Sequence, residues 1–303
     1  MRKFFIAISL LAASAGAQTL ELTNEVIASS DYTDSHDNVL GNGWIDRLHA
    51  IYDFPISMHL TDDRRPIVWR GVVRGTYSYM QNNGAAAVYN PDNILNATAN
   101  VMHIRPIASR WTLIATAGVG IHTAFDALTW RDFAVNAAAI FSYKYSEQLD
   151  YGIGAALVTT YGWPLVLPMP YLRWHNGGDT GAPTPGTWVF DVNFMGHIQA
   201  TASTWLTQDV SLMVNIFEME STFANVKMDG KWKVYSSTTM QSSVCPSLRL
   251  GPGKLSAALG VAWRRGTRIS DRSYSGFFKG FNHNRRRNFG TAVYVSLGYS
   301  MLL

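Results

Sequence analysis

The sequence predicts an all-β chain that forms a transmembrane, antiparallel, up-and-down β-barrel of about twelve strands, with about ten or fourteen strands as alternatives. Three observations lead to this fold class. The chain begins with an export signal, apolar and polar residues alternate along most of its length, and no later stretch has the run of about 18 apolar residues that marks a membrane-spanning helix. A tilted strand spans the same apolar core with about ten residues.

The N-terminus is typical of a cleaved secretory signal peptide. Arg2 and Lys3 form a short positive region, an apolar run extends over residues 4–13, and Ala15-Gly16-Ala17 is a small-residue cleavage site. We therefore expect residues 1–17 to be removed and residues 18–303 to form the barrel. This signal predicts export across the inner membrane of a Gram-negative bacterium and residence in the outer membrane.

Composition excludes several other classes of protein. Charged residues make up only 15% of the chain, and the net charge of +4 falls to +2 when Arg2 and Lys3 are removed. A charge this small gives no support for a nucleic-acid partner. Cys245 is the only cysteine, so no disulfide can form within the chain. The strand ladder must hold the fold together.

Alternation with period two is clearest in residues 67–79. Ile67, Trp69, Val73, Tyr77 and Tyr79 share one face, which we expect to contact lipid. The opposite face should line the lumen, and it carries Arg70, Arg74, Thr76 and Ser78. The same pattern occurs in the segments 44–58, 111–122, 133–145 and 188–199. Aromatic residues lie near the ends of these segments, as the two interfacial girdles of a membrane barrel require.

The predicted connections alternate between short and long, which gives the count of about twelve strands. Short turns should face the periplasm, together with both termini, and long loops should be extracellular. The segment 164–175 strains this count because it could form one more strand. Pro164, Pro168 and Pro170 cannot donate ladder hydrogen bonds, so we place the segment in a long loop over 162–186 that folds into the barrel mouth. The other long loops are 30–43, 81–94, 123–131, 223–235 (with Asp229-Gly230 as a hairpin turn) and 266–288.

The inward positions of the predicted strands supply the candidate lumen residues. Confined charges should be paired, and Arg70 and Arg74 could pair with Glu21, Glu25 or Asp53 on nearby strands. Such a network either braces the wall or lines a water-filled path. The lumen or pore candidates are Arg47, Asp53, Arg70, Arg74, Lys144, Asp191, His197 and Arg249.

The last long loop is strongly basic. Arginine forks bind phosphate bidentately, and the phosphates at a bacterial outer surface belong to lipopolysaccharide. The sharper interpretation is a basic funnel that concentrates anionic solutes at a pore. The candidates for binding surface anions or lipopolysaccharide are Arg264, Arg265, Arg268, Arg272, Lys279, Arg285, Arg286 and Arg287.

Catalytic and metal-binding signals are weak. Barrel lipid hydrolases carry His-x-Ser on one strand, and none of the eight histidines is followed two residues later by serine. Asp31, Asp34, His36 and Asp37 could suggest a protease rim or a divalent-cation site, but a solvated polar loop explains them better. We expect no cofactor, no metal and no enzymatic activity, with a lipid hydrolase as the remaining enzymatic alternative.

The C-terminal segment resembles the terminal strand signal that the barrel-assembly machinery reads, although Leu303 replaces the usual final aromatic residue. The order of a signal peptide, alternating strands, PLVLPMPYLRW and then WVFDVNF resembles porin-like outer-membrane β-barrel proteins of unknown function found in Bacteroidetes-type bacteria. This resemblance implies a barrel but no particular catalytic or binding residue.

The function that fits these patterns best is a passive, porin-like channel for small polar or anionic solutes. The alternatives are a non-conducting barrel with a structural or adhesive role and an outer-membrane lipid-modifying enzyme. Expected partners are outer-membrane lipid, lipopolysaccharide, the barrel-assembly machinery and small solutes, without nucleic acid.

Overall fold

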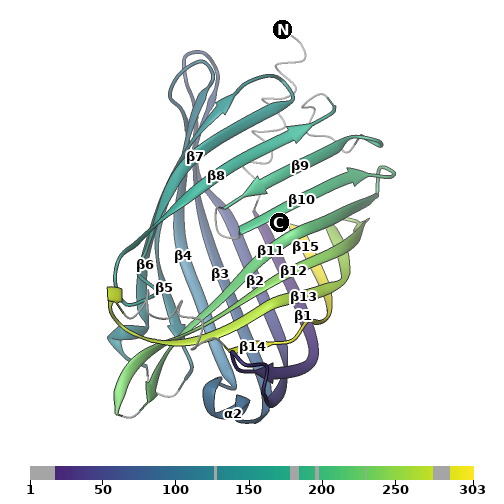
Figure 1. Ribbon diagram of the computed structural model, residues 1–303. Coiled ribbons are helices and arrows are strands. Elements are labelled where there is room, and N and C mark those ends of the chain that lie inside the picture. Colours follow the sequence, from purple (N-terminus) through teal and green to yellow (C-terminus); the bar gives the residue numbers. More distant parts are fainter. Residues whose placement is uncertain (1–17, 126–127, 178–183, 195–197, 229, 276–286) are drawn as a thin grey trace.

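The computed structural model describes residues 18–125, 128–177, 184–194, 198–228, 230–275 and 287–303 (Figure 1). The predicted signal peptide, His197, Lys279, Arg285 and Arg286 lie outside these residues. No helix in the described ranges is both long and apolar enough to cross a bilayer. The short helical elements are α2 (Ala86–Tyr89) and η1 (Trp130–Asp132).

The chain forms one closed antiparallel sheet, as the sequence predicted. Neighbouring strands in the sequence are neighbours in the sheet, and the first strand pairs with the last to close the barrel. The strands are β1 (Thr19–Thr33), β2 (Val39–Leu60), β3 (Pro66–Gly84), β4 (Asn93–Pro106), β5 (Trp111–Thr123), β6 (Phe133–Lys144), β7 (Leu149–Val158), β8 (Leu165–His175), β9 (Trp188–Asn193), β10 (Ile198–Trp205), β11 (Val210–Met228), β12 (Lys231–Leu250), β13 (Gly253–Asp271), β14 (Arg287–Phe289) and β15 (Ala292–Leu302).

The barrel has fourteen strand positions in its described residues, because β14 and β15 share one position between β13 and β1. The preferred count of twelve was therefore wrong, and fourteen was one of the alternatives. One additional strand comes from the segment 188–199, which is a hairpin of β9 and β10 and not a single strand. Val192 and Ala200 are cross-strand partners, and both have even residue numbers. The alternation of inward and outward residues therefore keeps the same phase on both strands, and the sequence pattern does not reveal the turn between them.

The other additional strand is β8, which the sequence analysis wrongly placed in a loop because of its prolines. His175 donates its backbone N–H to Gln148 O across the β7–β8 pair, at 3.0 Å. The register of this pair has no shift, so the odd-numbered residues of β8 are the ones that bond to β7. The nitrogens of Pro168 and Pro170 therefore face the other edge of β8, where a missing donor costs no bond to β7.

The two faces of the wall are those that the alternation predicted. Trp69, Val73 and Tyr77 are exposed on the outside of β3, whereas Val68 and Ser78 are buried toward the inside. Exposed aromatic and branched aliphatic side chains continue around the outside on the other strands. A surface of this kind is typical of a barrel whose wall contacts lipid.

The two ends of the barrel differ in their connections. One end holds the first residue of β1 and the last residue of β15, and we call it the turn end. Its connections are 61–65, 107–110, 145–148, 176–187, 206–209 and 251–252. The opposite end, with α2, is the loop end (Figure 1). The predicted long loop 162–186 is thus divided into a connection at the loop end, β8 and a connection at the turn end. The predicted loops 223–235 and 266–288 are also partly strand, because β11, β12 and β13 are longer than expected.

The sheet narrows toward the loop end because β9 and β10 are short (Figure 1). β11 pairs with β10 only as far as Met219, and beyond this residue it crosses to the other side of the barrel. There Asn225 pairs with Thr123 of β5, in parallel orientation. The loop end is consequently closed by a smaller ring, from β11 through β12–β15 and β1–β4 to β5.

Candidate functional site

A buried carboxylate organises the polar part of the lumen. Glu25 of β1 lies directly opposite Arg47 of β2, and Arg47 Nη1 is 2.7 Å from Glu25 Oε1. Gln241 of β12 donates to the same oxygen at 2.8 Å, from a strand that is not a neighbour of β1 in the sheet. Arg47 is only 1% exposed. Glu25 therefore links distant parts of the wall through charge-assisted hydrogen bonds.

His49 extends this network. Its Nε2 lies 3.5 Å from Glu25 Oε2, and its Nδ1 lies 3.1 Å from the hydroxyl of Thr76 on β3. Glu220 of β11 is buried and interacts electrostatically with both Arg47 and His49. The network thus contains two carboxylates, one guanidinium and one imidazole.

A second ion pair lies nearer the turn end. Arg70 Nε is 2.7 Å from Asp53 Oδ1, which is one of the pairings that the sequence analysis expected. Arg74, on the same inward face of β3, makes no ion pair within 4.0 Å among the described residues, although Glu21, Asp53 and Glu220 act on its charge from farther away. Arg74 therefore adds a positive charge to the inward face of β3.

An apolar plug fills the smaller ring on the loop-end side of this polar layer. Ile27 and Ile45 are the next inward-facing cross-strand pair after Glu25 and Arg47, on the side of the loop end. Side chains from β3, β4, β11 and β12 pack against them and are buried. The residues that we define as the plug are Ile27, Ile45, Met80, Ile94, Ala224, Val226 and Tyr235. Close-packed side chains of this kind exclude water from the axis of the smaller ring.

Two asparagines fix β11 in its crossed position. Asn96 of β4 donates from Nδ2 to Phe223 O at 2.8 Å and accepts from Phe223 N–H at 2.9 Å, so its amide pairs with the β11 backbone as a strand would. Asn225 donates to Arg131 O at 2.6 Å, and Arg272 donates to the side-chain oxygen of Asn225. We call these contacts the β11 clasp.

Comparison of the sequence with protein families assigns the chain to one of them. A family model described as a domain of unknown function (DUF6268) matches residues 13–301. The chain belongs to the DUF6268 family. A search of curated proteins finds no match to it. The expected membership in a barrel family of unknown function is thus supported in its general form, and the link to Bacteroidetes-type bacteria stays a prediction.

Solved structures similar to this DUF6268 chain are outer-membrane barrels. An outer membrane channel from Pseudomonas putida F1 is 12% identical, with a TM-score of 0.48 over 95% of this chain and 96% of that one. The toluene transporter TodX of Pseudomonas putida is 9% identical, with a TM-score of 0.36 over 97% and 92% of the two chains. The outer membrane protease OmpT from Escherichia coli is 8% identical, with a TM-score of 0.27 over 96% and 98%. Similarity this weak transfers neither a solute nor an activity.

The basic residues predicted to share one surface loop lie on different faces of the DUF6268 barrel. Arg264 and Arg265 belong to β13, where they form a β-bulge and Arg264 adopts a left-handed conformation with φ of 47°. The bulge turns Arg265 inward, where it is 1% exposed and donates to Ser30 Oγ and Gly290 O. Arg268, also in β13, stands over the ring of Tyr161, and Arg287 of β14 stands over Tyr89. Among the described residues, the expected single basic surface does not form.

The other lumen candidates lie toward the turn end. Asp191 of β9 is the cross-strand partner of Arg173 on β8. Arg249 of β12 stands over the ring of Trp205, with 5.5 Å between its guanidinium carbon and the ring centroid. Lys144 is the exposed last residue of β6. In the described part of the chain, no ion pair joins any of these three residues to the Glu25 network.

The acidic residues near the first connection at the loop end stabilise that connection. Asp34 accepts hydrogen bonds from the backbone N–H groups of His36 and Asn38 and from the side-chain amide of Asn38, at 2.8 to 3.0 Å. These hydrogen bonds, that of the Asn38 side chain foremost, hold the pKa of Asp34 below its usual value. This arrangement is an Asx turn, as the interpretation as a polar loop implies.

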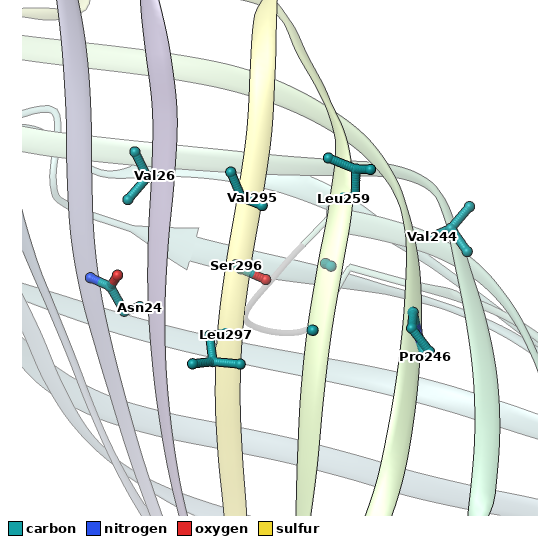
Figure 2. Close-up of a pocket in the computed structure, with 10 residues that line it drawn as sticks. Asn24, Val26, Val244, Pro246, Leu259, Val295, Ser296 and Leu297 are labelled. Atoms are coloured by element: carbon teal, nitrogen blue, oxygen red, sulfur yellow. The ribbon is translucent and has the colours of Figure 1, made fainter.

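An apolar groove of about 490 Å³ runs along the outside of the wall, over β1, β12, β13 and β15. Val244, Leu259, Val295 and Leu297 line it with exposed side chains (Figure 2). These residues have outward parity, so the groove does not open into the lumen. In a bilayer it would be filled by acyl chains.

Proposed function

We propose that this DUF6268 protein is a passive outer-membrane channel for small polar or anionic solutes, and that the plug and the β11 clasp hold it closed in the conformation described above. The observation that carries the proposal is the inward face on the turn-end side of the plug. There Arg70, Asp53, His49 and Arg74 lie on the inner wall of a closed barrel. Charged groups on the inside of an apolar-coated barrel favour passage of water-soluble molecules.

The same wall supports the proposed location and orientation of the barrel. An exposed apolar exterior favours a bilayer environment, and the export signal expected from residues 1–17 favours the outer membrane. We place the turn end in the periplasm, because both chain termini and most of the short turns lie there in barrels of this class, and five of the six connections at this end have two to five residues. The loop end then faces the exterior, where lipopolysaccharide is the expected neighbour of Arg287, and the barrel-assembly machinery is the expected insertion partner.

Conductance tests this proposal directly. We expect the refolded protein, residues 18–303, to give reproducible single-channel steps in a planar bilayer, with a preference for anions in the reversal potential. Joint replacement Arg70→Glu and Arg74→Glu should reverse that preference, because it exchanges two lumen cations for anions. Arg64→Glu, in the exposed 61–65 turn, is the matched control and should leave the preference unchanged. Selectivity that stays the same after the double replacement would contradict a role for these arginines.

A non-conducting barrel is the second candidate, and the apolar plug favours it. If the protein gives no current although gel mobility shows that it is folded, the buried Glu25 network serves only to brace the wall. The search for a function would then move to binding at the outer surface.

We infer that the lumen does no hydrolytic chemistry, although Thr76, His49 and Glu25 stand in the order hydroxyl, imidazole and carboxylate. Glu25 already accepts from Arg47 and Gln241, so its charge is committed to the structural network. A fluorophosphonate probe that reacts with activated hydroxyls should leave Thr76 unmodified in intact-mass and peptide measurements. Modification of Thr76 that is lost in the His49→Ala variant would reopen the enzymatic alternative.

A further inference from the structure

The ladder of hydrogen-bonded strands is interrupted between β8 and β11. β8 pairs with β7 along almost all of its length, but with β9 only from Leu172 to His175. Within the described ranges, no strand pairs with the second edge of residues 165–171. In the described residues, β11 pairs with β10 as far as Met219, and beyond it the backbone of Asn225 pairs with Thr123 of β5. The side chain of Asn96 on β4 bonds to Phe223, and the ring of Tyr161, in the connection before β8, lies 5.0 Å from the Phe223 ring. Two strand edges therefore border a break in the wall on the loop-end side of β9 and β10.

This break is poorly suited to binding a peptide strand. The nitrogens of Pro168 and Pro170 face it, as the hydrogen bond from His175 to Gln148 establishes, and proline nitrogen has no hydrogen to donate. On the other side, the side chain of Asn96 already occupies the backbone groups of Phe223. Pro168 and Pro170 on one edge and Phe223 on the other are thus unavailable for pairing with another chain, and features of this kind protect exposed edges.

The inward face beside the break is apolar, unlike the charged face of β1–β3, and its β6 and β7 rows hold small residues. On β8 the inward residues Leu165, Leu167 and Met169 precede the first charge, Arg173. On β6 and β7 the same rows hold Ala138 and Ala156, and Gly154 lies opposite Met169. Leu167 is 36% exposed although it has inward parity. An apolar molecule would meet no charged side chain on this part of the wall.

We propose that the break between β8 and β11 is a lateral entrance, through which small amphiphiles pass from the bilayer into the lumen beneath the plug. Their apolar body would follow the inward face of β6–β8. Their polar or anionic head would meet Arg74 and the Arg70–Asp53 pair, on the turn-end side of the plug. The proposal rests on the proposed channel function and narrows its substrate class to molecules with an apolar body and an anionic head.

Access of lipid to position 167 tests the entrance. In a Cys245→Ala background, Leu167→Cys is labelled with an environment-sensitive fluorophore, and the protein is refolded into vesicles with nitroxide on the acyl chains. We expect quenching close to that of the outward control Leu157→Cys. Ala138→Cys is the matched inward control, because Ala138, Ala156 and Leu167 lie in one cross-strand row. The fluorophore at position 138 should stay unquenched. Equal, weak quenching at positions 167 and 138 would overturn the proposal.

The substrate class has its own measurement. In these vesicles, octanoate should slow severalfold the alkylation of the Leu167→Cys variant by a small maleimide, and Arg74→Gln should remove most of that protection. Sulfate, an anion without an apolar body, should give none. Equal protection by both anions would refute the amphiphile class. Neither measurement requires ionic current, so the two proposals can fail separately. Lipid quenching at position 167 in a barrel that gives no current would reject the channel and retain the entrance. Conductance without quenching at position 167 would reject the entrance and retain the channel.

Discussion

Replacing Glu25 by alanine should lower the free energy of unfolding by about 3–5 kcal/mol, because it removes the carboxylate that forms an ion pair with the buried guanidinium of Arg47. The same change removes the acceptor of Gln241 and the carboxylate beside His49. Urea unfolding of the protein in vesicles, followed by the fluorescence of its ten tryptophans, measures the effect.

Two further variants separate charge from packing. Glu21→Ala, an exposed carboxylate of the same strand, should change the unfolding free energy by less than about 0.5 kcal/mol. The pair Glu25→Leu with Arg47→Met should recover most of the stability, because a buried ion pair is often replaceable by apolar residues of similar volume. If Glu25→Ala alone costs no more than Glu21→Ala, the network does not brace the wall.

The sequence was sufficient for the fold class and for the faces of most strands, because both depend on local alternation. The outward position of Trp69 and the inward position of Arg74 follow from parity alone. The missed strands have equally local explanations. β9 and β10 keep the same parity through their turn, and Pro168 and Pro170 were assumed to lie in a continuous ladder, whereas they lie at an edge.

The candidate site was predictable only where its partners are neighbours in the sheet. The expected Arg70–Asp53 pair joins adjacent strands, and parity placed both residues inside. Gln241 and Asn96 were not anticipated, because each bonds to a strand that is not adjacent to its own. Arg265 was assigned to the surface, since one extra residue in the bulge of β13 reverses the side to which it points. Contacts across the lumen depend on the path that β11 takes across the barrel. No local sequence pattern predicts that path.

Breaking the β11 clasp should open the channel. Asn96→Ala removes the amide that bonds to both the N–H and the C=O of Phe223, and each lost hydrogen bond is worth about 0.5–1.5 kcal/mol. A shift of about 1–3 kcal/mol between closed and open conformations changes their ratio by about 5- to 150-fold. Single-channel recording should therefore show a higher open probability, with the unit conductance unchanged.

Asn100→Ala is the matched control, because Asn100 lies on the same face of β4 but its side-chain amide donates to nearby Thr98 of the same strand. Its open probability should equal that of the unmodified protein. If Asn96→Ala folds but opens no more often, the apolar plug alone keeps the smaller ring closed. Replacing Met80 and Ile94 by alanine should then open it, since shortening two buried side chains removes contacts that the plug shares with β11 and β12. If neither change raises the open probability, solutes do not pass through the smaller ring. The break in the wall beside β8 would then be the remaining route for them.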